Sequence, residues 1–143
     1  MSSIKEYLTS DHRECDEVFS RFEESIDSGS DEKIKELYEE LKDRFLTHFK
    51  MEEEVVFKEF LESAGEGCNP IPVMISEHDN MRSLIDRIGQ SVEKNDKNMI
   101  FSLLDTLMIV VQQHNMKEEN VMYNLLDQSI ANKDEAISAM KSI

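Results

Sequence analysis

An internal repeat with a period of 66 positions relates the two halves of this 143-residue chain. In each half, two histidines lie 36 positions apart, and two glutamates follow the second histidine four and five residues later. The first half contributes His12, His48, Glu52 and Glu53, and the second half contributes His78, His114, Glu118 and Glu119. Histidine nitrogen and glutamate oxygen are ligands of transition metals. The repeat therefore predicts a duplicated metal site, or one site assembled from both halves.

The spacing of hydrophobic residues predicts an all-α fold. Hydrophobic side chains recur every three or four residues through positions 4–26, 34–55, 71–92 and 100–125. The four histidines lie on these hydrophobic stripes, and so do Glu52, Val55, Glu118 and Val121. Only four Gly and two Pro occur, and 33% of the residues are charged, which favours helices.

Three breaks, at residues 27–30, 63–69 and 93–96, separate the stretches. Because short turns join antiparallel helices, we expect an up-down-up-down four-helix bundle. It would occupy residues 1–130, with a C-terminal tail or short helix at residues 131–143.

The turns repeat as well. Gly29 and Asn95 are 66 positions apart, and both residue types tolerate the left-handed conformation that ends many helices. Ser30 and Asp96 follow them as predicted N-caps. Asn69–Pro70 is predicted to supply an N-cap and a first-turn proline to the third helix.

Charge and composition narrow the partners and the location. A net charge of −15 argues against nucleic acid and anionic membrane surfaces as partners. No hydrophobic run approaches the ~20 residues that span a bilayer, and the first residues lack the basic and hydrophobic regions of a signal peptide. Cys15 and Cys68 suggest no disulfide framework. We therefore expect a cytoplasmic protein, whose protein partners the sequence does not indicate.

Helix geometry brings the histidines to one level. His12 precedes Gly29 by 17 positions and His48 follows it by 19 positions. At a rise of about 1.5 Å per residue, they differ in height by about 3 Å. The second pair of histidines stands in the same relation to Asn95, and a glutamate lies one turn beyond His48 and His114 on the same helix face. The predicted metal ligands are His12, His48, Glu52, His78, His114 and Glu118.

Burial decides between a metal centre and an ordinary core. A lone histidine on a hydrophobic stripe is often a hydrogen-bonded core residue, and a bundle without metal is the alternative. Two buried carboxylates without a cation would be costly, which favours metal. Six ligands exceed the four that tetrahedral zinc takes, whereas two ions that share bridging carboxylates would use all six. Iron or manganese suits such ligands, and iron is favoured by its oxygen-linked chemistry.

The pattern differs from that of ferritin-like di-iron bundles. Those bundles take a glutamate from each of two helices and a Glu-x-x-His motif from each of the other two, whereas here every helix supplies a histidine. A ferritin-type oxidase is therefore not expected.

Four segments surround the histidines: DHRECDEVF at His12, HFKMEEEVVF at His48, EHDNMRSLI at His78 and HNMKEENVMY at His114. Over about residues 5–127, their order and spacing resemble the hemerythrin family, in its HHE cation-binding branch. The resemblance implies a non-haem di-iron centre with an oxo or hydroxo bridge. It implies that His12 and His48 hold one iron, that His78 and His114 hold the other, and that Glu52 and Glu118 bridge both.

Two positions depart from the oxygen-carrying hemerythrins. Those proteins have a fifth histidine one turn before the position of His78, where this chain has Met74. They also have a bridging aspartate five residues after the last histidine, where this chain has Glu119; Glu118 is the alternative typical of the HHE branch. The missing histidine leaves a coordination position for a small ligand, which argues against reversible oxygen storage.

The expected function is that of a di-iron protein that binds or senses O₂, NO or peroxide. The alternative is an iron donor or storage protein for the repair of iron–sulfur centres. Catalytic turnover is a third hypothesis, but no acid or base stands apart from the ligand set, so a non-enzymatic role is favoured.

Neighbouring residues have more than one interpretation. Asp11 and Glu77 either orient ligand imidazoles through hydrogen bonds or are solvated. Glu53 and Glu119 are more often surface residues than spare ligands. Cys15 either reports redox state or, as favoured here, is a small core residue. Met74 and Met81 are expected to pack in the core, while Tyr7, Tyr38 and Tyr123 are not distinguished.

Overall fold

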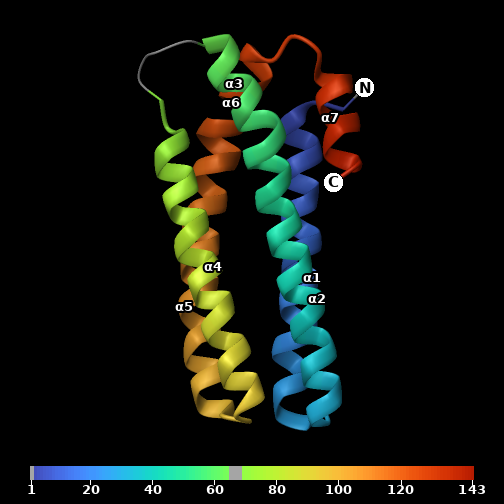
Figure 1. The fold of residues 1–143 in the computed structure, drawn as a ribbon, viewed down its shortest axis with the longest axis vertical. Helices are drawn as coiled ribbons and strands as arrows, with labels where there is room; N and C mark the ends of the chain where they lie inside the picture. Colours follow the sequence, from blue (N-terminus) through green and yellow to red (C-terminus); the bar gives the residue numbers. More distant parts are fainter. Residues whose placement is uncertain (1, 65–68) are drawn as a thin grey trace.

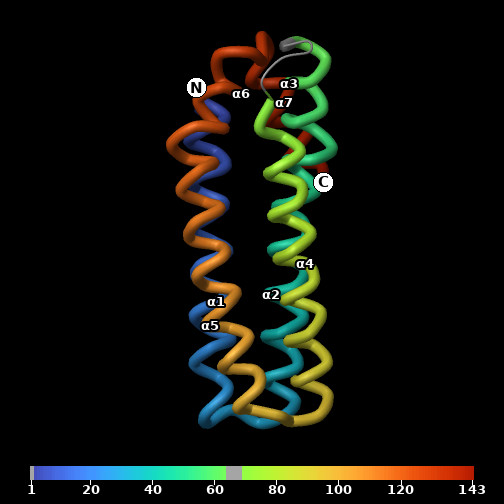
Figure 2. The backbone as a smooth tube through the Cα atoms, turned by 90° about the vertical axis from the view of Figure 1, so that its left-hand side faces the viewer, coloured from blue at the N-terminus to red at the C-terminus, as the bar shows by residue number. Residues whose placement is uncertain are grey.

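The computed structural model describes residues 2–64 and 69–143. These residues are helical and include no strand, which confirms the all-α prediction. Four long helices run along the long axis of the molecule: α1 (Ile4–Ser28), α2 (Asp31–Met51), α4 (Ile71–Glu93) and α5 (Lys97–Lys117) (Figure 1). Helix α2 packs against both α1 and α4, and α5 likewise packs against both α1 and α4. The turned view in Figure 2 shows α1 beside α5 and α2 beside α4.

Short elements close the end of the molecule where the chain termini lie (Figure 1). Helix α3 (Phe57–Ala64) continues α2 through η1 (Glu52–Val56), and α6 (Tyr123–Ser129) continues α5 through η2 (Glu118–Met122). Helix α7 (Lys133–Lys141) packs against α1 and η1. The Asp127 carboxylate accepts hydrogen bonds from the backbone N–H groups of Ile4 and Lys5, at 2.8 and 3.2 Å, which joins the start of α1 to α6. None of the helices in the described ranges combines the length and hydropathy of a membrane span.

The predicted N-caps of α2 and α5 are confirmed. The side chain of Ser30 accepts a hydrogen bond from the Lys33 N–H, and that of Asp96 accepts one from the Met99 N–H. At the start of α4, Pro70 occupies the N-cap position that was predicted for Asn69. Asn69 lies one residue earlier, and its Oδ1 accepts a hydrogen bond from the Ile71 N–H at 2.9 Å. The predicted break at residues 63–69 falls largely on residues 65–68, which lie outside the described residues.

The two hairpin turns differ in a way that corrects the prediction for Gly29. Asn95 has a positive φ of 54°, as predicted, but Gly29 is extended, with φ −78° and ψ 157°. The N–H of Gly29 donates to the Ser25 carbonyl at 2.7 Å, and a Cβ at this position would lie 2.5 Å from that oxygen. Close backbone approach, and not a left-handed conformation, explains the glycine.

The elements η1 and η2 are π-helical turns that shift the register of the helices. The Phe57 N–H donates to the Glu52 carbonyl, and the Tyr123 N–H donates to the Glu118 carbonyl, each five residues back. This wider turn corrects the predicted stripes. Val121 is 55% exposed and Val55 only partly buried, while Val56, Phe57, Met122 and Tyr123 are buried in their place.

Two hydrophobic clusters lie on either side of the histidines. One fills the molecule towards the hairpin turns and includes Phe19, Phe22, Leu41, Ile85 and Leu104. The other fills the end near the termini and includes Leu8, Phe57, Met74, Leu126 and Met140. On α1, α2 and α4 the histidine falls between residues of these two clusters, and His114 falls between Val111 on α5 and Met122 on η2, so a polar layer is enclosed by two hydrophobic ones.

Candidate metal centre

The structure brings all six predicted ligand residues together in one buried layer. Their exposure lies between 0% and 3%, for His12, His48, Glu52, His78, His114 and Glu118. The ring centroids of His12 and His48 are 4.6 Å apart, and those of His78 and His114 are 4.8 Å apart. Each hairpin therefore carries two histidines at one level, as helix geometry predicts.

The six side chains form two overlapping groups. One consists of His12, His48, Glu52 and Glu118, and the other of Glu52, His78, His114 and Glu118. Within each group, the candidate ligand atoms lie within 4.8 Å of one another. Glu118 Oε1 is 3.0 Å from Nε2 of both His12 and His114, and Glu52 Oε1 is 3.0 Å from His78 Nε2. Glu52 Oε1 is also 3.4 Å from His48 Nε2, so both glutamates lie close to histidines from the two hairpins.

Several atoms at the centre of this set lack hydrogen bonds. Six buried side-chain polar atoms in the described residues have no partner, and one of them is Thr9 Oγ1. The other five belong to the predicted ligand residues: His48 Nε2, Glu52 Oε1, His78 Nε2, His114 Nε2 and Glu118 Oε2. Buried polar atoms in folded proteins are normally paired, because an unpaired one costs about 1–3 kcal/mol. Close approach without hydrogen bonding is the arrangement expected of atoms that share a cation.

The other nitrogen of each imidazole is held by a second carboxylate. Nδ1 of His48 donates to Asp11 at 2.6 Å, and Nδ1 of His114 donates to Glu77 at 2.7 Å. These contacts show the orienting role that the sequence left open. Because a carboxylate only accepts, Nδ1 carries the hydrogen and Nε2 is directed at the centre.

Glu53 and Glu119 make the same kind of contact with the other two histidines. His78 Nδ1 donates to Glu53 at 2.6 Å, and His12 Nδ1 donates to Glu119 at 2.8 Å. The two carboxylates are partly buried, and each contacts a histidine of the other hairpin. Their membership in the 66-residue repeat was the available signal for this role.

The outer carboxylates are those that contact the Nδ1 atoms of the histidines, namely Asp11, Glu53, Glu77 and Glu119. Basic side chains pair with three of these four. Arg44 pairs with Asp11 and Glu14, Arg82 with Glu53 at 2.8 Å, and Lys117 with Glu77 at 2.5 Å. Burial raises the pKa of the Asp11, Glu53 and Glu77 carboxyls, but the hydrogen bonds and charges of their histidine and basic partners outweigh it and lower each pKa below its usual value. These groups are therefore carboxylates at neutral pH.

The surroundings of the six predicted ligand residues favour positive charge at the centre. Burial alone would lower the pKa of His48 and His78, yet the surrounding carboxylates raise the pKa of His78 to about 10 and that of His48 well above its ordinary value. The pKa of His114 is also raised, against burial, by Glu118 and Glu52. Contacts with the histidines hold the pKa of Glu118 well below its usual range despite burial. A bound cation would supply the positive charge that this environment favours.

Tyr123 is the one tyrosine that contacts the ligand set within the described residues. Its hydroxyl donates to Glu52 Oε2 at 2.6 Å and lies 3.0 Å from Glu118 Oε1 and 2.9 Å from His12 Nε2. Burial and the charges of Glu118 and Glu52 raise the Tyr123 pKa well above its ordinary value. Tyr38 donates instead to the Ile85 carbonyl, and Tyr7 to Met51 Sδ.

The residues expected to be core residues are buried. Cys15 is 4% exposed, and Met74 and Met81 lie in the hydrophobic clusters. Asp11, Cys15 and His48 also approach one another, but Asp11 is already bonded to His48 and Arg44. Cys68 lies outside the described residues.

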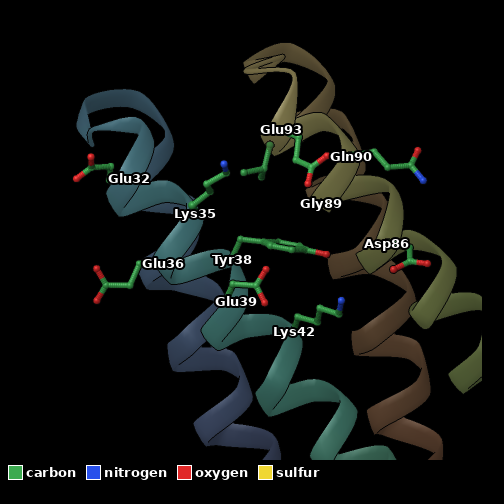
Figure 3. A pocket seen from close by; sticks show the side chains of 11 residues that line it. Glu32, Lys35, Glu36, Tyr38, Glu39, Lys42, Asp86, Gly89, Gln90 and Glu93 are labelled. Carbon is green, nitrogen blue, oxygen red and sulfur yellow. The ribbon is translucent and has the colours of Figure 1, made fainter.

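A surface cavity near the hairpin turns is separate from this centre. It has a volume of about 520 Å³ and lies between α2 and α4, lined by residues that include Lys35, Tyr38, Gly89 and Glu93 (Figure 3). Figure 3 shows the Tyr38 ring extending from α2 towards α4. None of the six predicted ligands lines this cavity.

Comparison with known proteins identifies one family. The model of the hemerythrin HHE cation-binding domain matches residues 3–140, almost the whole chain. Neither the curated proteins nor the solved structures contain a significant match.

Proposed function

The chain belongs to the hemerythrin family of HHE cation-binding domains, and we propose on this premise that it holds two iron ions. The four long helices would form an up-down-up-down bundle. His12 and His48 would hold one iron, His78 and His114 the other, and Glu52 and Glu118 would bridge them. The two overlapping groups of buried side chains support this assignment.

The unpaired buried atoms carry the proposal. Three histidine nitrogens and two carboxylate oxygens face one another without hydrogen bonds, in a layer between two hydrophobic clusters. A core without metal would leave each of these atoms unsatisfied. The outer carboxylates on Nδ1 favour the same interpretation, because a metal-bound histidine usually donates its other N–H to a carboxylate or carbonyl.

We further propose that the centre binds or senses O₂, NO or peroxide. Bound iron would supply redox chemistry and an open coordination position for such a small ligand. Met74, where oxygen-carrying hemerythrins have a fifth histidine, is 4% exposed and packs in the hydrophobic cluster near the termini. Sensing is favoured over iron donation because the ligand side chains are at most 3% exposed, so releasing the metal would require the helices to separate.

The first experiment measures iron in anaerobically purified protein, together with its Mössbauer spectrum. Two iron ions per chain in a coupled centre are expected, and less than one ion of any metal would exclude the proposed centre. Anaerobic protein is then titrated with O₂ and with NO, and the absorption of the centre is recorded. A loaded centre whose spectrum responds to neither gas would contradict the sensing role but not the metal site.

A further inference from the structure

The two halves of the centre carry different aromatic residues at one position of the repeat. The bridging glutamates, the histidines and the outer carboxylates all correspond at an interval of 66 positions. Five residues after the bridging glutamate, however, the first half has Phe57 and the second half has Tyr123. The π-helical turns place both residues similarly, since each N–H donates to the carbonyl of its own glutamate.

The two rings occupy equivalent positions against the histidines. Phe57 stacks on His78 with ring centroids 6.0 Å apart and an interplanar angle of 13°. Tyr123 stacks on His12 with ring centroids 5.5 Å apart and an angle of 29°. Tyr123 is 0% exposed, so its hydroxyl adds an oxygen to one side of the centre alone.

The distances from this oxygen to the neighbouring predicted ligand atoms are compatible with a further ligand. Two atoms bound to one ion at about 2.1 Å and at right angles lie about 3 Å apart. The hydroxyl of Tyr123 is 2.6 Å from Glu52 Oε2, 2.9 Å from His12 Nε2 and 3.0 Å from Glu118 Oε1. All three residues belong to the group that contains His48, and tyrosine oxygen is an established iron ligand in proteins.

We propose that Tyr123 is a further ligand of the ion held by His12 and His48, which makes the two metal positions inequivalent. The inference rests on the proposed di-iron centre. On coordination the phenol O–H bond breaks, an oxygen–metal bond forms and the proton is released to water, with no transfer of electrons. Phe57 offers no such atom to the ion held by His78 and His114.

Resonance Raman spectroscopy of the oxidised, iron-loaded protein tests the assignment. A phenolate bound to ferric iron gives a visible charge-transfer band, and excitation in that band enhances tyrosine ring vibrations. We expect these vibrations in the wild-type protein and a shift in their frequencies when the chain carries ring-deuterated tyrosine. Tyr123→Phe should lose the band while retaining two iron ions, and Tyr38→Phe should leave the spectrum unchanged.

Phe57→Tyr is the matched gain-of-function variant. It should add a second phenolate contribution and increase the charge-transfer absorption about twofold. Wild-type protein that contains two irons but shows no tyrosine vibrations would overturn the ligand assignment and leave the di-iron centre standing. Protein that binds no iron would overturn both. The isotope shift is measured on the wild-type chain, so it does not depend on how the variants fold.

Discussion

Nδ1 of His48 lies 2.6 Å from the carboxylate of Asp11, on the neighbouring helix α1. The other ring nitrogen, Nε2, faces the centre without a hydrogen-bond partner. Asp11 is in turn held by Arg44, so a series of charged contacts runs from the partly exposed Arg44 side chain to the His48 ring. A similar arrangement occurs in the second half of the repeat, where Glu77 joins His114 to Lys117.

Asp11→Asn should weaken metal binding without removing a ligand. The amide keeps the shape of the side chain but loses the negative charge that orients the His48 ring and makes its nitrogen a better donor. We expect metal affinity to fall roughly 10- to 100-fold, measured by competition with a chelator of known affinity. Glu77→Gln should give a similar loss at His114. Unchanged affinity in both variants would mean that these carboxylates have no influence on the ligands.

Glu52→Ala should remove both ions together. Glu52 belongs to both groups of candidate ligands, so its loss breaks the connection between the two metal positions. Metal analysis across a titration is expected to find populations with two ions or none in the wild type, and few bound ions in the variant. Glu54→Ala, at an exposed position two residues further on, is the control and should bind as the wild type does. Retention of one tightly bound ion by Glu52→Ala would show that Glu52 serves a single position.

The convergence of the six predicted ligand residues could be foreseen because two independent signals coincide at their positions. His48 and Glu52, for example, are chemically unusual on a hydrophobic stripe, and the 66-residue repeat duplicates them. Helix rise and turn position then determine their height along the molecule, without any knowledge of side-chain contacts.

The contacts of the outer carboxylates and the helix register were harder to predict from the sequence. Glu53 lies one residue off the hydrophobic stripe, a position that helical spacing assigns to the surface, and it contacts His78 of the other hairpin. The π-helical turns were hidden because residues 55–57 and 121–123 are each three consecutive hydrophobic residues, which fit either register. Because of the same ambiguity, the sequence did not distinguish Tyr123 from the other two tyrosines.

Gly89→Ala should destabilise the protein without affecting the metal centre. A Cβ at Gly89 would lie 2.3 Å from the Tyr38 hydroxyl and 2.7 Å from its ring. The Tyr38 side chain must therefore move, and its hydroxyl loses the hydrogen bond to the Ile85 carbonyl. Such overpacking costs about 1–3 kcal/mol, which exceeds the roughly 1 kcal/mol that alanine gains over glycine in a helix. Urea denaturation measures the loss, and Gln90→Ala, at the neighbouring position, should be near neutral. Equal stability of the two variants would contradict the observed packing.

Cys15 should remain unreactive in the folded protein at neutral and mildly alkaline pH. Burial raises the pKa of its thiol from 9.0 to about 12, so only about one molecule in ten thousand carries the reactive thiolate at pH 8. In a Cys68→Ser background, where Cys15 is the single thiol, alkylation by iodoacetamide should be slow until urea unfolds the chain. Rapid stoichiometric alkylation of the native protein at pH 8 would contradict this burial and revive the redox-reporting role.

The same raised pKa should make the stability contribution of Cys15 depend on pH. The unfolded chain releases the thiol proton above about pH 9, whereas the folded chain retains it to about pH 12, so the contribution is fully present below pH 9 and declines across this window. Cys15→Ala should therefore show a shallower fall in unfolding free energy between pH 9 and pH 11, measured by urea denaturation at each pH. Identical pH profiles for the variant and the wild type would show that the thiol has the same pKa in both states.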